Sequence, residues 1–116
     1  MKPAIVRPRR HDGKVKVPIA CTLGASDATE RIDEWRAFLG ECVTSTARRE
    51  CAVRLTLDSS DATVVRAVDL ATREKRCCAF FSFAIEIEAD QTSLVITVPE
   101  DAIPILEELA TLVPPD

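Results

Sequence analysis

The sequence predicts an α+β fold, a two-layer sandwich in which helices cover one face of a mainly antiparallel sheet. Segments with alternating apolar residues, typical of strands with one buried face, stand among segments with apolar residues at helical spacing. The order of these segments begins with a ferredoxin-like β-α-β-β-α-β core, which a C-terminal strand and helix extend. A chain of 116 residues suits one hydrophobic core, so we expect a single domain over residues 15–113.

The first half of this domain supplies three predicted strands and one helix. Residues 15–23 alternate as a strand, and a helix begins at Ser26 or Asp27, either of which suits an N-cap. The apolar stripe of this helix consists of Ile32, Trp35, Leu39 and Cys42. Residues 43–46 are rich in β-branched side chains and predict a short strand, and residues 51–58 alternate again and predict the next one.

The second half predicts a helix, a hairpin and a last helix. Ser59 or Ser60 suits the N-cap of the first of these helices. Its apolar face consists of Val64, Val68, Ala71 and Cys78, with Ala67, Leu70 and Cys77 beside it. Residues 81–89 and 94–99 alternate as the two strands of the hairpin, and Asp101 begins the last helix.

Composition and charge indicate a globular chain with a basic N-terminal tail. Hydrophobic residues make up 47% of the chain and charged residues 29%, as in ordinary folded domains. The net charge is −4, although the first 16 residues carry six basic side chains against Asp12 alone. We therefore expect residues 1–14 to form a basic flexible tail, and we expect the acidic body not to bind nucleic acid by itself.

Neither a membrane partner nor secretion is expected. No apolar run approaches the roughly 20 residues that span a bilayer. The N-terminal residues carry charge but lack the apolar segment of a secretory signal. We therefore expect a cytoplasmic protein, in which the five cysteines are free thiols rather than disulfides.

Most catalytic signatures are missing from the sequence. His11 is the one histidine and lies in the tail, so a cysteine or serine nucleophile in the body has no histidine base. The chain also lacks a glycine-rich phosphate loop, a C-x-x-C pair and zinc-finger spacing. We expect no organic cofactor, and the sequence favours a binding protein over an enzyme.

The adjacent cysteines Cys77 and Cys78 are the strongest candidate site. They end the second predicted helix, where a disulfide between neighbouring residues would close a strained ring. Cys21 faces inward near the end of the first predicted strand, which the ferredoxin-like plan places beside the strand that follows the second helix. The three thiolates would then form a metal site that selects a soft ion or metalloid, such as Hg(II), As(III), Cu(I) or Cd(II).

Other residues would support such a site, although each also has a purely structural interpretation. Glu74 lies one helical turn before the cysteine pair and would orient a thiol, accept its proton or provide an oxygen ligand. The aromatic residues that would form a dry wall around the thiols are Trp35, Phe80, Phe81 and Phe83. Cys42 and Cys51 fall on inward faces and are interpreted as small hydrophobic residues of the core.

Three segments together carry a resemblance to a known family: "IACTL" (19–23), "RIDEW" (31–35) and "EKRCCAFFSF" (74–83). They resemble a small bacterial cysteine-pair domain that occurs alone or appended to mercury-resistance-type transcriptional regulators. Its pattern is A-C-T-L, then R-x-x-E-W, then E-x-x-C-C-x-F-x-x-F. The matching positions are Cys21, Arg31, Glu34, Trp35, Glu74, Cys77, Cys78, Phe80 and Phe83. The resemblance covers residues 15–113 and implies an association with soft metals.

The sequence departs from this family's pattern at one position beside the cysteines. Family members often have proline where this chain has Ala79, which changes the turn more than the thiol chemistry. The local cysteine-pair and phenylalanine string is also similar to one in organomercurial lyase. The rest of that enzyme's pattern is not found in this chain, so its activity is not carried over.

Three functional hypotheses remain open on the sequence. The first is a thiolate-based binding protein for a soft metal or metalloid, working in resistance or sensing. The second is a small cysteine-dependent enzyme or thiol redox protein that uses Cys77 or Cys78. The third is a ligand-sensing or dimerisation module with structural cysteines, in which the chain pairs with a second copy as a homodimer.

Overall fold

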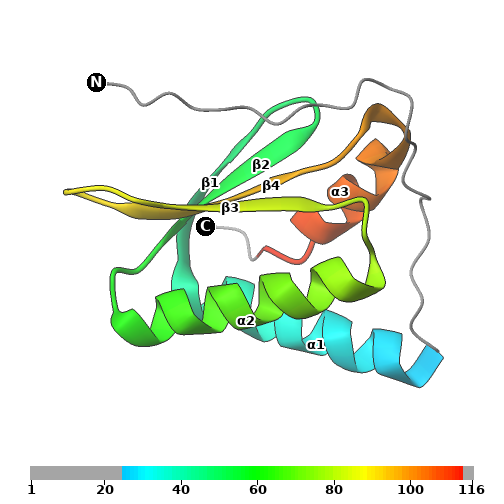
Figure 1. Ribbon diagram of the computed structural model, residues 1–116, viewed down its shortest axis with the longest axis horizontal. Coiled ribbons are helices and arrows are strands. Elements are labelled where there is room, and N and C mark those ends of the chain that lie inside the picture. The colour runs from blue at the N-terminus through cyan, green and yellow to red at the C-terminus, as the bar shows by residue number, and fades with distance from the viewer. Residues whose placement is uncertain (1–24, 114–116) are drawn as a thin grey trace.

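The computed structural model describes residues 25–113, with side chains from Thr29 onward, and shows the expected α+β architecture. Its elements are α1 (Ala25–Cys42), β1 (Val43–Arg48), β2 (Ala52–Leu57), α2 (Asp61–Cys77), β3 (Ser82–Ile87), β4 (Thr92–Thr97), a 3-10 turn η1 (Glu100–Ala102) and α3 (Ile103–Ala110). The helices and the sheet form two layers, an arrangement compatible with a ferredoxin-like fold (Figure 1). The tail predicted over residues 1–14 and the strand predicted over residues 15–23 lie outside the described residues.

Within residues 25–113 the sheet has four antiparallel strands in the order β1-β2-β4-β3. Two hairpins, β1–β2 and β3–β4, are joined by the pairing of β2 with β4, in which Ala52 lies opposite Thr97 and Leu57 opposite Thr92. β4 therefore occupies the centre and pairs along one edge of β3. Among the described strands, the other edge of β3 has no neighbour.

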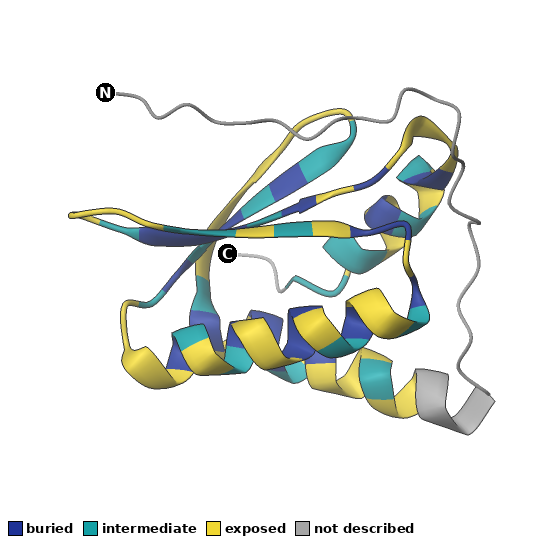
Figure 2. Ribbon diagram, in the orientation of Figure 1, coloured by how far each residue is buried: buried dark blue, intermediate teal, exposed yellow. Residues whose placement is uncertain are grey.

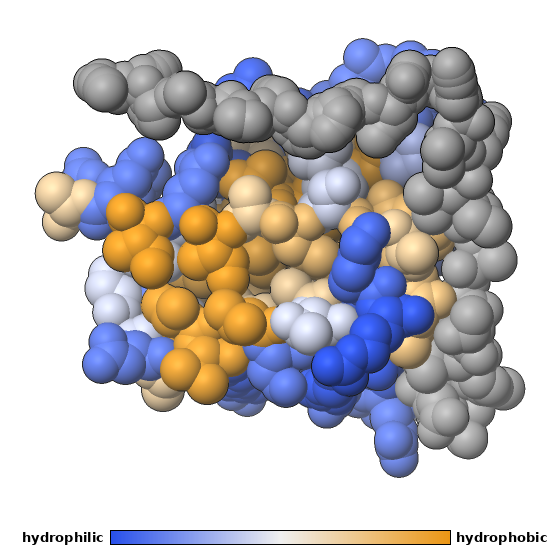
Figure 3. Space-filling model, viewed as in Figure 1, coloured by the Kyte–Doolittle hydropathy of each residue, from blue (hydrophilic) through white to orange (hydrophobic). Residues whose placement is uncertain are grey.

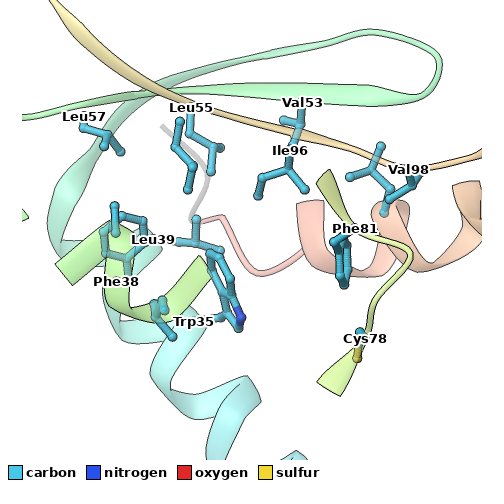
Figure 4. Packing of buried hydrophobic residues seen from close by; sticks show 14 of the residues in the cluster. Trp35, Phe38, Leu39, Val53, Leu55, Leu57, Cys78, Phe81, Ile96 and Val98 are labelled. Carbon is cyan, nitrogen blue, oxygen red and sulfur yellow. The ribbon is translucent and has the colours of Figure 1, made fainter. Parts of the chain in front are cut away.

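The hydrophobic core lies between the sheet and the helices (Figures 2 and 4). The alternation of β2 points Val53, Leu55 and Leu57 toward the helices, and β4 adds Leu94 and Ile96, all of them buried. The α1 residues that face these strands are Trp35, Phe38, Leu39 and Cys42. Burial of one such large side chain stabilises the fold by about 1.5–3 kcal/mol, so this contact holds the two layers together.

The buried faces of the elements differ in detail from the predicted ones. Phe38 is fully buried, whereas Ile32 is 46% exposed, because the core contact of α1 follows an i, i+3, i+4, i+7 series that starts at Trp35. On α2 the residues that pack into the core lie beside the predicted apolar face. Val68, which the sequence places on that face, is 47% exposed. Ile87 is 70% exposed at the end of β3, and Figure 3 shows apolar surface gathered between this end and α2.

Both ends of α2 are set by local hydrogen bonds. Ser60 is the N-cap, as the sequence predicts, and its hydroxyl accepts a hydrogen bond from the backbone N–H of Thr63. At the other end the helix stops at Cys78, whose backbone is not helical. None of the helices within residues 25–113 combines the length and apolar character that a membrane span requires.

Candidate functional site

A pocket of about 540 Å³ opens where α1, the end of α2, the start of β3 and α3 meet. Most of its walls are aromatic and aliphatic, and its few polar groups come mainly from α1 and α2. Its lining residues are Arg31, Ile32, Trp35, Arg36, Glu74, Cys78, Phe80, Phe81, Phe83, Ile105, Glu108, Leu109, Thr111 and Leu112. Cys78 and the aromatic residues that the sequence singled out therefore line a common cavity, and Cys77 adjoins it.

Glu74 is the buried polar group of this pocket. Its position on α2 turns the carboxylate toward α1, and the residue is only 8% exposed. The indole N–H of Trp35 donates a hydrogen bond of 2.9 Å to Oε1, and Arg31 Nη1 donates one of 3.3 Å to the same oxygen. A buried carboxylate requires such partners, since desolvation without them is costly. Glu74 thus joins α1 to α2 beneath the sheet.

Arg31 connects Glu74 to the cysteines. Its Nη2 lies 4.0 Å from the sulfur of Cys77, and its Nε lies 3.4 Å from Glu34 on the next turn of α1. Burial alone would lower the pKa of Arg31, but the Glu74 carboxylate and the hydrogen bond to Cys77 outweigh it, so the pKa is raised above its ordinary value. A fixed positive charge therefore stands beside the Cys77 sulfur.

The two cysteines occupy different environments although they are adjacent. Cys77 is the last residue of α2 and is half-buried, whereas Cys78 is the C-cap, is buried and lines the pocket. The turn after the helix is held by two backbone hydrogen bonds, from Cys78 N–H to the Glu74 carbonyl and from Phe81 N–H to the Cys78 carbonyl. This turn carries Cys78 and Phe80 to the pocket wall.

Aromatic rings form a large part of the pocket wall. Trp35 and Phe83 lie nearly parallel, with ring centroids 6.2 Å apart and an interplanar angle of 14°. Phe81 contacts both Phe80 and Phe83, with centroid distances of 4.6 and 5.5 Å. Figure 4 shows Trp35 and Phe81 beneath the sheet, with Cys78 on the α2 side of Phe81.

The structure brings together most of the site that the sequence predicts. Among those residues, the ones that line the pocket are Glu74, Trp35, Phe80, Phe81, Phe83 and Cys78, and Cys77 adjoins them. Cys21, the third predicted thiolate, lies outside the described residues. Within residues 25–113, no group of three or more histidine, cysteine or acidic side chains could hold a metal ion, so the part of the site described here provides two thiols.

Sequence reasoning missed several residues of this pocket. Arg31 was singled out only as a position of the family pattern, yet it forms the ion pair with Glu74. The sequence feature that could have placed it in the pocket is its position four residues before Trp35, on the same face of the helix. Ile105 and Leu109 of α3, and Leu112 just after this helix, also line the cavity. No local pattern could place α3 beside this pocket, because the packing of α3 against β2 depends on the tertiary fold.

The remaining described cysteines lie away from this pocket. Cys42 is buried in the core, as predicted, and its sulfur lies 3.5 Å from the Thr63 hydroxyl oxygen. Cys51 is half-buried in the turn before β2 and does not belong to the core cluster. Neither of them lines the pocket.

Comparison with protein-family models, curated proteins and solved structures found no match to this chain. The resemblance to the cysteine-pair domain thus rests on the sequence segments alone and stays a prediction. Any statement about function therefore depends on the chemistry of the pocket and its thiols.

Proposed function

We propose that the chain binds a thiophilic metal ion or metalloid, of the Hg, As, Cu or Cd class, through Cys77 and Cys78, in resistance or sensing. The observation that carries this proposal is the placement of Cys77 beside the Arg31–Glu74 ion pair and of the adjacent Cys78 in the wall of a largely apolar pocket. Thiolate sulfur is a soft ligand and selects soft ions over the abundant hard ones. Apolar walls favour the same ions by limiting access of water to the sulfur–metal bonds.

The charges around the cysteines fit this chemistry. A metal takes up thiols as thiolates, so binding releases protons and adds negative charge to the site. The Arg31 guanidinium, 4.0 Å from the Cys77 sulfur, offsets part of that charge. Glu74 lies one helical turn before the pair, and its carboxylate holds the Arg31 guanidinium in this position. Cys21 remains the predicted third ligand.

Arsenite is the sharpest probe of this proposal, because As(III) is held well only where two or more thiols converge. The parent chain and the variant with both Cys77→Ser and Cys78→Ser are titrated with As(III) by calorimetry, with native mass spectrometry to count bound arsenic. We expect the double variant to lose at least about a hundredfold in affinity, since serine is a hard ligand that keeps its proton. With Cd(II), which brings no hydroxide to take up the thiol protons, parent affinity should rise with pH toward the ordinary thiol range near 8.5.

Cys51→Ser is the matched control, because it removes one half-buried thiol that lies away from the pocket. Its affinity for As(III) should stay within about twofold of the parent, and circular dichroism should show all three proteins folded. Equal binding by the parent and the double serine variant would overturn the proposal. Turnover of a thiol substrate by the parent, abolished by one cysteine change and without metal binding, would establish the enzymatic alternative instead.

A further inference from the structure

The pocket beside the thiols is also large enough to hold a small organic molecule. Its volume of about 540 Å³ lies within the roughly 300–1,000 Å³ typical of small-molecule sites. Such sites combine mostly apolar walls with a small number of polar groups that fix orientation. Here the walls include the rings of Trp35, Phe80, Phe81 and Phe83, which favour a flat aromatic occupant through stacked and tilted contacts.

The carboxylate of Glu74 has unused capacity to accept a hydrogen bond. Both of its side-chain partners, Trp35 and Arg31, donate to Oε1, and no described side chain donates to Oε2. A carboxylate accepts hydrogen bonds at both oxygens, and buried polar atoms are nearly always satisfied. Glu74 is 8% exposed and lines the pocket, so an occupant that carries a donor would complete its hydrogen bonding.

The charge balance of the pocket favours an uncharged donor. Glu74 is already paired with Arg31, whose side chain is 13% exposed. The other charged lining residues, Arg36 and Glu108, are exposed and of opposite sign. A cationic ligand would therefore lose its hydration without gaining an unpaired negative charge. A hydroxyl group donates one hydrogen bond without that cost.

We infer that this pocket binds a small uncharged aromatic alcohol of the phenol class, with its ring among the aromatic side chains and its hydroxyl donating to Glu74. This site requires no sulfur atom, so it does not rest on metal binding. It also gives a physical reason for a carboxylate at a position that packing alone would fill with an apolar residue.

The test uses 4-methylphenol and toluene, which differ by one hydroxyl group. Trp35 is the one tryptophan of the chain, and its indole N–H donates to Glu74, so its single indole resonance in a proton–nitrogen NMR spectrum reports on the site. Titration of the full chain with 4-methylphenol should shift this resonance saturably. Toluene should bind at least about tenfold more weakly, because it cannot donate to a carboxylate.

Two variants and a third ligand complete the test. Glu74→Gln should reduce the preference for 4-methylphenol over toluene severalfold, since a charged acceptor is stronger than an amide. Glu86→Gln, on the outer face of the sheet, should leave the preference unchanged. Equal affinity for 4-methylphenol and toluene, no saturable shift with either, or tighter binding of the cation 4-methylbenzylammonium would each overturn the inference.

Discussion

At the scale of single residues, the least expected feature is a charged network where packing would favour apolar side chains. Glu74 is nine-tenths buried, and its two donors come from α1, on the opposite side of a helix–helix contact. Arg31 is held by Glu34 and Glu74 together, which fixes the guanidinium beside Cys77. The network therefore fixes the charged groups next to the Cys77 thiol. It also contributes to the stability of the helical layer.

Removal of Arg31 should leave the buried charge of Glu74 without its ion-pair partner and so destabilise the fold. Arg31→Met keeps much of the side-chain volume but leaves Glu74 with one donor, and we expect a loss of about 1–3 kcal/mol in the free energy of unfolding. The same change in a Glu74→Gln background should cost less, because no unpaired charge remains. Urea denaturation of the four proteins gives the coupling energy directly.

A surface pair provides the matched control for this cycle. Arg54 and Glu86 form an ion pair on the outer face of the sheet, and both side chains are 40% exposed. Arg54→Met should therefore cost less than Arg31→Met, since exposed pairs are screened by solvent. If the two arginine variants lose the same stability, or if the Arg31 cycle shows no coupling, the network is not a buried structural unit.

At the scale of elements, α2 positions the site through its two ends. The C-cap directs Cys78 into the pocket, and the N-terminus is fixed by a cluster in which Asp58 accepts hydrogen bonds from the Ser60 N–H and the Thr63 hydroxyl. These contacts favour the ionised carboxyl, so the pKa of Asp58 is lowered from its ordinary value. The start of the helix is therefore sensitive to pH although the end that carries the thiols is distant from it.

This lowered pKa predicts a pH dependence of stability. A depressed carboxyl pKa stabilises the fold above the unfolded-state value of about 3.9, and that contribution is lost as the pH falls through the folded-state value. Asp58→Asn should therefore lower the melting temperature at pH 7, and its difference from the parent should shrink as the pH falls below about 4.

Ser60→Ala separates this effect from simple loss of a cap. It removes the N-cap hydroxyl, which is worth about 1 kcal/mol, but it keeps the Asp58 carboxyl and its hydrogen bonds from the Ser60 N–H and the Thr63 hydroxyl. Its difference from the parent should depend less on pH than that of Asp58→Asn. Thermal melts of the three proteins between pH 2.5 and 7 check the prediction, and parallel curves for both variants would contradict it.

The sequence predicted these elements well where a local pattern decides them. The alternation of residues 51–58 and the serine before α2 led directly to β2 and to the N-cap. Phe38 was missed because Ile32 and Phe38 both continue an apolar stripe through Trp35, and only the position of the sheet decides between them. The burial of Glu74 could not be predicted for a similar reason, since its partners lie on another helix.

At the scale of the whole molecule, one continuous core connects the helices to all parts of the site. Trp35 belongs to this core and to the pocket wall, contacts Phe38 and Phe83 and is 3% exposed. The central position of β4 was not predictable from local pattern, because it depends on a pairing between distant segments. The site and the sheet should therefore unfold together.

A single cooperative transition is the expected result. In urea, the fluorescence of Trp35, which reports on the pocket, should shift at the same midpoint as the far-ultraviolet circular dichroism of the whole chain. Coincidence is expected because the described helices and strands share one core cluster. Loss of the tryptophan signal at a clearly lower urea concentration would instead show that the pocket opens as a separate unit.

The central position of β4 also bears on how the chain folds as it is synthesised. Each hairpin pairs segments that are close in sequence, whereas β2 and β4 are separated by α2 and β3. Closing that long loop costs chain entropy before any of its hydrogen bonds form, so joining the two hairpins is the expected slow step. The helix surfaces that carry Trp35, Glu74 and Cys78 leave the ribosome before β4 does. Until the last strand emerges, they have no complete sheet to pack against, and their apolar faces are open to other chains and to chaperones.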